Sequence, residues 1–118
     1  MFSKRLITIA RCAEDHFPDI LGEAPMIYSD KVRLMFVDGS YMDIRYPVDS
    51  KYSFHWQREH EIIRIDTAPH HRELSTYPAH MHIGKEEDVV EDTVTNMNNS
   101  IEENVRNVLG FVRRILEK

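Results

Sequence analysis

A change in hydrophobic period near residue 26 constrains the fold of this chain more than any other feature. Beyond that point apolar and polar residues alternate, as Val32, Leu34 and Phe36 do with their neighbours, and a two-residue period is typical of a strand with one buried face. The Asp-Gly pair at residues 38–39 favours a tight hairpin turn, because glycine tolerates positive φ. The sequence therefore predicts an antiparallel sheet that begins with a hairpin.

The alternating pattern continues downstream of this hairpin turn. Tyr52, Phe54 and Trp56 fall on one face of a strand and should belong to the core. Pro47 is expected to end the strand before it, and a polar turn at residues 58–60 should connect it to the next strand. Three further strands are expected over residues 41–46, 51–57 and 61–66, and a short fifth strand could cover residues 79–83.

A helix is predicted at the N-terminal end of the chain. Residues 3–17 repeat apolar side chains at three- and four-residue steps, with Ser3 as the N-cap and Pro18 as the stop. Three consecutive β-branched residues in this segment leave a strand over residues 6–10 as the alternative.

The C-terminal segment also has helical spacing. Apolar side chains follow this spacing over residues 101–116, and Asn98 or Asn99 could cap the helix. An antiparallel sheet with one apolar face needs a cover, which two amphipathic helices can supply. The predicted fold is α+β, a single domain over residues 1–118, in which a meander of four or five antiparallel strands is covered on one face by an N-terminal and a C-terminal helix.

Length and charge limit the classes of function. A chain of 118 residues suits one hydrophobic core. The formal charge of −5 disfavours a strongly basic nucleic-acid binder, so any contact with RNA would have to use a local basic patch. Cys12 is the only cysteine, which excludes an internal disulfide. No stretch approaches the ~20 apolar residues of a membrane span, so we expect a cytoplasmic protein with no membrane partner. Residues 85–92 are typical of a solvated acidic connector.

Histidine is concentrated in one part of the chain. Six of the seven histidines fall within residues 55–82, the histidine-rich segment. In an extended backbone His80 and His82 would project from one face, about 7 Å apart at Cα. Such a pair suits either two ligands of one metal ion or a general acid and base on either side of one scissile bond. Asp66, at the end of the fourth strand, could accept a hydrogen bond from an imidazole and fix its tautomer.

Other residues of this segment add to the candidate site. His70 and His71 lie in a loop predicted over residues 67–78, where their rings should be exposed. His55 should lie on the polar face of the third strand, close to residues 63–65 if the third and fourth strands pair. The candidate substrate-binding residues are Arg64, Arg72, His55 and Tyr77.

A structural alternative applies to each of these residues. Isolated histidines such as His16 and His60 are more often surface residues than ligands. The loop histidines could instead hold their loop in place through hydrogen bonds from imidazole to backbone carbonyls. Tyr77 could be structural, and the two arginines could be solvated surface residues.

Three stretches of the chain read Tyr-Ser-Phe-His-Trp-Gln at residues 52–57, Arg-Ile-Asp-Thr-Ala-Pro-His-His at residues 64–71 and Thr-Tyr-Pro-Ala-His-Met-His at residues 76–82. They resemble the TumE-like family of prokaryotic toxin–antitoxin proteins. Family members show Tyr-Ser-Tyr-His, Asp-Asn-Ala-Pro-His-His and Thr-Phe-Pro-His-His-x-His in the same order. Thr67 stands where the family has Asn, and Ala79 stands where members often have another His. The resemblance covers about residues 50–84 and implies a toxin-like protein encoded beside an antitoxin, which could act on RNA.

The first function considered is a toxin-type ribonuclease that needs no cofactor. In this hypothesis His80 and His82 are the acid–base pair and Asp66 orients them. Arg64 and Arg72 would stabilise the charged phosphorane. The full set of candidate catalytic residues is His70, His71, His80, His82 and Asp66.

The second function considered is a non-catalytic binding module. Here His70, His80 and His82 would hold a divalent metal, for which zinc is the natural ion, or the histidines would rigidify a partner-binding loop. The resemblance implies a cognate antitoxin as protein partner, with RNA as a further partner of a toxin. An edge strand of the sheet or the C-terminal helix could also pair two copies into a homodimer.

Overall fold

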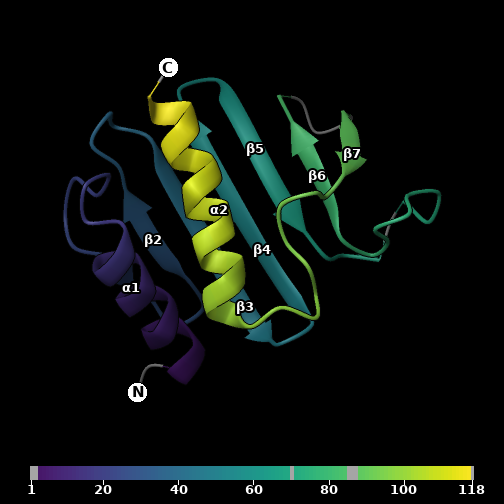
Figure 1. Cartoon of the computed structure of the whole chain (residues 1–118), viewed down its shortest axis with the longest axis horizontal. Coiled ribbons are helices and arrows are strands. Elements are labelled where there is room, and N and C mark those ends of the chain that lie inside the picture. The colour runs from purple at the N-terminus through teal and green to yellow at the C-terminus, as the bar shows by residue number, and fades with distance from the viewer. Residues whose placement is uncertain (1–2, 70, 85–87, 118) are drawn as a thin grey trace.

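The computed structural model of the protein describes residues 3–69, 71–84 and 88–117 (Figure 1). Within these residues the chain forms two helices and seven strands, in the order α1 (Lys4–His16), β1 (Met26–Ile27), β2 (Val32–Met35), β3 (Tyr41–Val48), β4 (Lys51–Arg58), β5 (Glu61–Asp66), β6 (His80–Ile83), β7 (Val89–Glu91) and α2 (Ile101–Leu116). The α+β class is confirmed, but the predicted count of four or five strands was too low.

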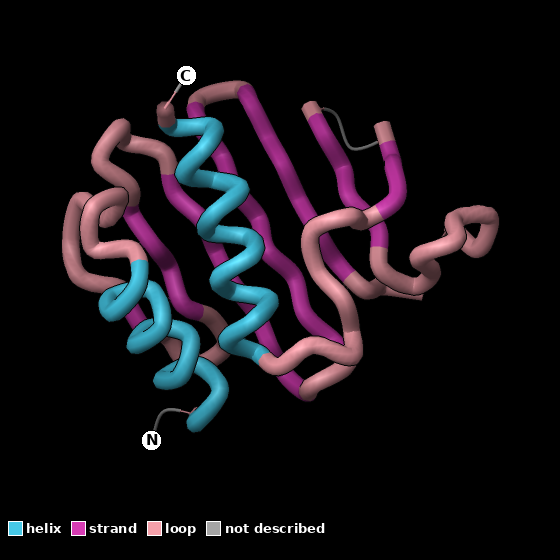
Figure 2. The backbone as a smooth tube through the Cα atoms, in the orientation of Figure 1, coloured by secondary structure: helices cyan, strands magenta, loops and turns pink. Residues whose placement is uncertain are grey.

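The seven strands form one antiparallel meander, in which each strand pairs with the next along the chain (Figure 2). The two strands that the prediction missed lie at the edges. β1 has only two residues, too few for a hydrophobic period to show. β7 lies in the segment that was expected to be a solvated connector, yet it pairs with β6 through Met81 and Val90. Residues 85–87 of that connector lie outside the described part of the chain.

Pro47 does not end β3, which continues to Val48. The pairing register between β3 and β4 shifts between Arg45 and Val48, so Pro47 lies within an irregular stretch. A proline lacks the backbone N–H that a regular ladder needs, but a bulge tolerates it. The proline therefore marks an irregularity in the pairing near the end of the strand.

The prediction of a helix at the N-terminal end is confirmed. Ser3 is the N-cap of α1, and its hydroxyl oxygen accepts a hydrogen bond from the Leu6 N–H at 3.2 Å. Phe17, directly before Pro18, is the C-cap. The alternative of a strand over residues 6–10 was wrong, because the apolar stripe of this segment packs on the core at helical spacing.

Ser100, and not Asn98 or Asn99, caps α2. The Ser100 hydroxyl accepts a hydrogen bond from the Glu103 N–H at 3.1 Å, and the Glu103 carboxylate accepts one from the Ser100 N–H at 3.0 Å. This reciprocal capping box satisfies two N–H groups at the start of the helix. The predicted cap was therefore one or two residues too early.

Both helices cover the same face of the sheet, as predicted, and lie side by side on it (Figure 1). Tyr52, Phe54 and Trp56 point to this face and are buried, so their assignment to the core is confirmed. One buried cross-strand row on this face consists of Val32, Ile44, Phe54, Ile65 and Met81.

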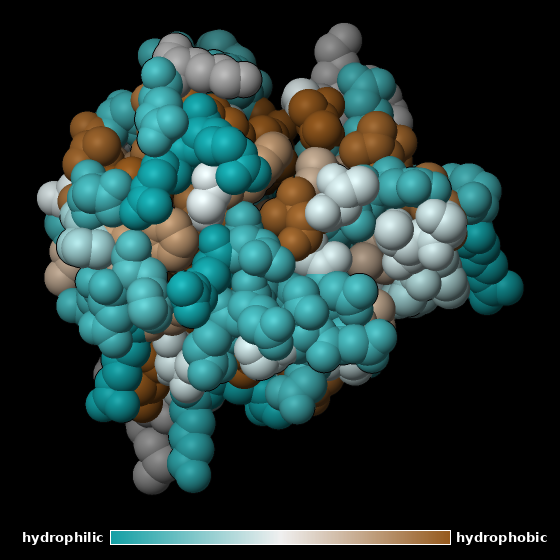
Figure 3. All heavy atoms as spheres, viewed as in Figure 1, coloured by the Kyte–Doolittle hydropathy of each residue, from teal (hydrophilic) through white to brown (hydrophobic). Residues whose placement is uncertain are grey.

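The outer surface of the helix layer is largely hydrophilic, with hydrophobic atoms visible between α2 and the strands β6 and β7 (Figure 3). Neither helix in the described part of the chain has the length and apolar character of a membrane span. No described helix lies on the opposite side of the sheet, which we call the open face. The candidate site lies on the open face.

Candidate functional site

The register of the strands gathers the polar residues of the histidine-rich segment on the open face. Residues directly opposite each other on neighbouring strands point to the same side of a sheet. The predicted proximity of His55 to residues 63–65 is confirmed, since His55 pairs with Arg64. One row on the open face contains Asp43, His55, Arg64 and His82, and the next row contains Arg45, Ser53, Asp66 and His80.

Asp66 and His80 are in direct contact. Nε2 of His80 lies 3.0 Å from Oδ1 of Asp66, and Nδ1 of the same ring lies 3.0 Å from the carbonyl oxygen of Pro78. Oδ1 of Asp66 also accepts a hydrogen bond from the Ala68 N–H at 3.0 Å, and Nε of Arg64 lies 3.1 Å from Oδ2. Asp66 therefore orients His80, and both ring nitrogens of His80 face oxygen atoms.

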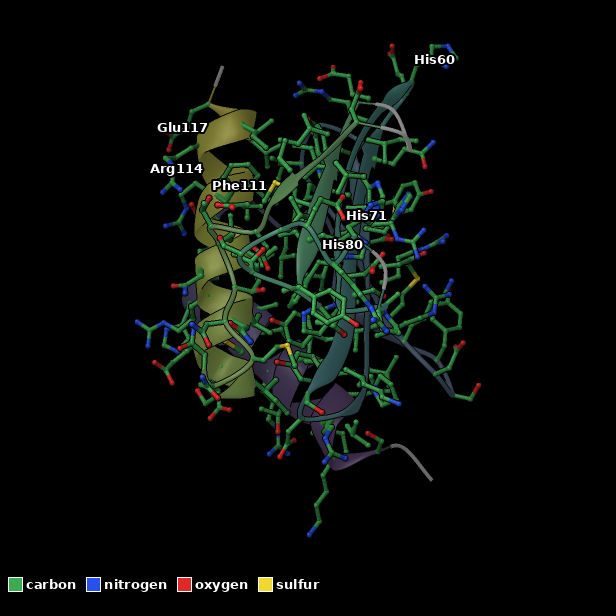
Figure 4. All side chains as sticks on the ribbon, turned by 90° about the vertical axis from the view of Figure 1, so that its right-hand side faces the viewer. His60, His71, His80, Phe111, Arg114 and Glu117 are labelled. Carbon is green, nitrogen blue, oxygen red and sulfur yellow. The ribbon has the colours of Figure 1, made fainter. Side chains whose placement is uncertain are left out.

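His71 joins His80 and His82 in what we call the histidine trio. The ring centres lie 5.0 Å apart for His71 and His80, 6.0 Å for His71 and His82, and 4.9 Å for His80 and His82. One nitrogen from each ring lies within 4.8 Å of the others. His71 reaches this position with a φ of 59°, in the left-handed region that is costly for a non-glycine residue. Figure 4 shows His71 next to His80, away from α2 and from His60.

The trio is sheltered from solvent. His80 is 2% exposed, His82 and Asp66 are each 6% exposed, and His71 is half-buried. A cavity on the open face begins beside the trio, and its lining includes Arg64 and Asp66 but none of the trio. The three rings therefore lie together beside this cavity, with His80 in contact with Asp66.

The other predicted site residues take different positions. Arg64 lies near the trio, because its guanidinium pairs with Asp66, which contacts His80. His55 lies on β4, two strands away from His80 and His82 on β6. Arg72 and Tyr77 are exposed residues of the loop between β5 and β6. His70 lies outside the described residues.

Sequence reasoning missed the parts of the site that the backbone supplies. The carbonyl of Pro78 and the N–H of Ala68 hold His80 and Asp66 in place, and neither group has a sequence signal. The Pro78 contact is of the kind that the structural alternative expects, so it rigidifies the loop in either function. Arg45 was also missed, although its place on the polar side of an alternating strand would have put it on the open face.

The comparisons with known proteins agree with the resemblance seen in the sequence. No curated protein and no solved structure gives a significant match to the chain. The model of the family described as Toxin TumE matches residues 13–116, which include all seven strands and the whole of α2. Because this match spans most of the chain, the protein belongs to the TumE toxin family.

Proposed function

We propose that this protein is the toxin of a toxin–antitoxin pair and that it acts by cleaving RNA. Membership of a toxin family indicates the toxin component of such a pair and implies an antitoxin partner. RNA cleavage goes beyond family membership and rests on the chemistry of the open face. The observation that carries it is the cross-strand pair of Arg64 and His82 directly beside the pair of Asp66 and His80.

RNA can be cleaved without a metal through its own 2′-hydroxyl group. A base removes the hydroxyl proton, the 2′-oxygen attacks phosphorus, and an acid gives a proton to the departing 5′-oxygen. The products are a 2′,3′-cyclic phosphate and a 5′-hydroxyl. Imidazole suits both roles because it exchanges protons near neutral pH. We give these two roles to His71 and His82, whose ring centres lie 6.0 Å apart.

The contacts of His80 favour a positioning role over the acid–base role expected from the sequence. Both of its nitrogens already face oxygen atoms, one of them on Asp66. Its ring packs edge-on against the rings of His71 and His82 and so holds both in place. His82 lies directly across from Arg64, whose guanidinium would stabilise the charge that develops on the phosphorane. We assign the acid–base roles to His71 and His82 because their rings lie side by side and His82 lies across from Arg64.

Cleavage of a labelled RNA by untagged protein in EDTA tests this proposal. His71→Ala and His82→Ala should each lower the rate by at least about a hundredfold, the lower end of what a general acid or base contributes. His60→Ala is the matched control, because His60 is exposed at the turn between β4 and β5, and it should cleave at the wild-type rate. Equal cleavage by wild type and His82→Ala would refute the proposal.

A non-catalytic metal site is the second candidate function for the same residues. The nitrogens of the histidine trio lie within 4.8 Å of one another, and zinc binds imidazole at about 2.0–2.1 Å, so a modest contraction would bring all three to one ion. The contact of His80 Nδ1 with the Pro78 carbonyl is of the kind that orients a ligand histidine, and Nε2 of His80 would exchange its contact with Asp66 for the ion. The candidate metal ligands are therefore His71, His80 and His82, with His71 in place of the His70 that was expected from the sequence.

Metal analysis of protein prepared without a polyhistidine tag separates the two functions. One equivalent of zinc that is lost in His80→Ala and His82→Ala, together with no RNA cleavage, would favour the metal-binding module. Undiminished RNA cleavage by the wild type in EDTA would rule out the non-catalytic metal-binding module.

A further inference from the structure

Two cavities on the open face share part of their lining. One, with a volume of about 310 Å³, reaches Asp66. The other, with a volume of about 350 Å³, reaches Tyr41. Arg45, Ser53 and Arg64 line both, so the two cavities adjoin, and we call them together the open-face groove. Its Asp66 end adjoins the histidine trio.

The carboxylate of Asp43 in this groove is already neutralised. Nε and Nη2 of Arg33 lie 2.7 and 2.9 Å from its two oxygens, and Nζ of Lys31 lies 3.3 Å from one of them. Burial alone would raise the pKa of Asp43, but the hydrogen bonds and charges of these two cations outweigh burial and hold the pKa below its usual range. Because two cations contact one carboxylate, the net charge at this side of the groove is positive.

Two further cations of the lining are available to a ligand. The carboxylate at the other end, Asp66, is paired with Arg64 and with His80. The side chain of Arg45 is 44% exposed and meets the exposed side chain of Asp30 at 3.8 Å. An exposed ion pair of that length contributes little stability, so a phosphate can replace it. Lys51, also exposed, lines the groove at its Asp66 end.

Two rings line the groove at its far end. The rings of Tyr41 and His55 lie with centres 6.5 Å apart and planes 30° apart, and both are held by Oε1 of Gln57, at 3.0 and 3.1 Å. The guanidinium of Arg33 lies 4.6 Å from the centre of the Tyr41 ring. Rings fixed in this way can stack on unpaired bases, whereas a double helix keeps its bases stacked on one another.

We infer that the open-face groove binds single-stranded RNA, with Arg45 and Lys51 on the phosphates and Tyr41 on a base, and leads it to the histidine trio. The inference rests on the proposed RNA cleavage. The groove supplies the local basic patch that a chain with a net charge of −5 needs in order to bind a polyanion. Arg64 lines the groove and lies directly across from His82. It therefore marks the point at which the bound RNA would reach the histidine trio.

Binding of a fluorescent, fully 2′-O-methylated oligoribonucleotide, measured by anisotropy over a series of salt concentrations, tests the inference. The methyl groups block attack by the 2′-oxygen, so binding is measured apart from cleavage. Arg45→Ala and Lys51→Ala should each weaken binding about tenfold and lower the slope of log K against log salt by about 0.7, the contribution of one phosphate contact on a single strand. Tyr41→Leu should weaken binding about tenfold without changing that slope, because stacking is not ionic.

Arg11→Ala is the matched control, because Arg11 is exposed on α1, the helix that covers the opposite face. It should bind like the wild type, and melting curves should show that all variants are folded. Wild-type binding by Arg45→Ala and Lys51→Ala would overturn the inference even if the protein cleaves RNA. An acidic peptide that binds more tightly than RNA, with the same dependence on Arg45, would assign the groove to a protein partner and also overturn it.

The failure of the proposed function would look different. If the wild type binds RNA through Arg45 and Lys51 but cleaves none, the groove stands as an RNA-binding surface and only the cleavage proposal falls.

Discussion

His80 and Asp66 lie directly opposite each other on β6 and β5, and this register brings Nε2 of His80 to within 3.0 Å of Oδ1 of Asp66. The other nitrogen of the ring faces the carbonyl oxygen of Pro78. Both ring nitrogens therefore lie within hydrogen-bond distance of an oxygen atom. Asp66 therefore fixes the ring against which His71 and His82 pack.

Asp66→Asn keeps the shape of the side chain but removes its charge. We expect the rate of RNA cleavage to fall about 10- to 100-fold, as is usual when the partner that orients a functional histidine is replaced. Asp15→Asn, an exposed substitution on α1, should leave the rate unchanged. If Asp66→Asn cleaves at the wild-type rate, Asp66 does not position the trio.

Asn104 ties α2 to the sheet and to the segment before the helix. Its Nδ2 donates to the Tyr46 hydroxyl and to the Asn96 carbonyl, both at 3.0 Å, and its Oδ1 accepts from the Asn96 N–H at 3.0 Å. Asn104→Ala leaves buried groups without partners and should lower the free energy of unfolding in urea by about 1–3 kcal/mol. Asn107→Ala, on the exposed side of the same helix, should change it by less than about 0.5 kcal/mol. Equal effects of the two substitutions would show that this network adds no stability.

Tyr52 should ionise late as the pH rises. Burial raises the pKa of Tyr52 to about 12, although its hydrogen bond with Thr95 works in the opposite direction. The neutral phenol therefore stabilises the fold fully below the ordinary value of about 10, and this stabilisation is lost as the pH rises through about 12. A spectrophotometric titration should show a tyrosinate phase near that value that Tyr52→Phe removes and Tyr28→Phe retains. Loss of the phase in Tyr28→Phe instead would contradict the assignment.

Asp43 should make the fold sensitive to acid. Its pKa is lowered, because the hydrogen bonds from Arg33 and Lys31 outweigh burial. The ionised carboxylate therefore stabilises the fold above the ordinary value of about 3.9, and this contribution is lost as the pH falls through the lower value in the folded state. Urea unfolding at a series of pH values below about 4 should show a shallower loss of stability for Asp43→Asn than for wild type. Asp49→Asn should keep the wild-type slope, because the side chain of Asp49 is 83% exposed.

The central strands could be predicted because a long strand with one buried face imposes a two-residue period, as Tyr52, Phe54 and Trp56 show. The edge strands β1 and β7 are too short to impose a period, so only the pairing of the whole sheet defines them. Ser100 was missed because serine and asparagine are about equally good caps. The glutamate three residues after Ser100, which completes the capping box, was the signal that distinguishes it.

The site was predictable where extended backbone fixes the side on which a residue points. That rule placed His80 and His82 on one face, and pairing then brought Asp66 opposite His80. It does not extend to His71, whose position depends on a loop with a positive φ. Burial of the rings also depends on how that loop packs, which spacing along the sequence does not determine.

The chemical nature of the RNA ends shows whether the protein cleaves RNA through the 2′-hydroxyl group and whether His82 takes part. Products of a labelled RNA, incubated in EDTA with wild type or with His82→Ala, would be examined by mass spectrometry. We expect 2′,3′-cyclic phosphate and 5′-hydroxyl ends with the wild type, and at least about a hundredfold less of them with His82→Ala. Intact RNA with the wild type, or the same ends in equal amounts from both proteins, would contradict this expectation.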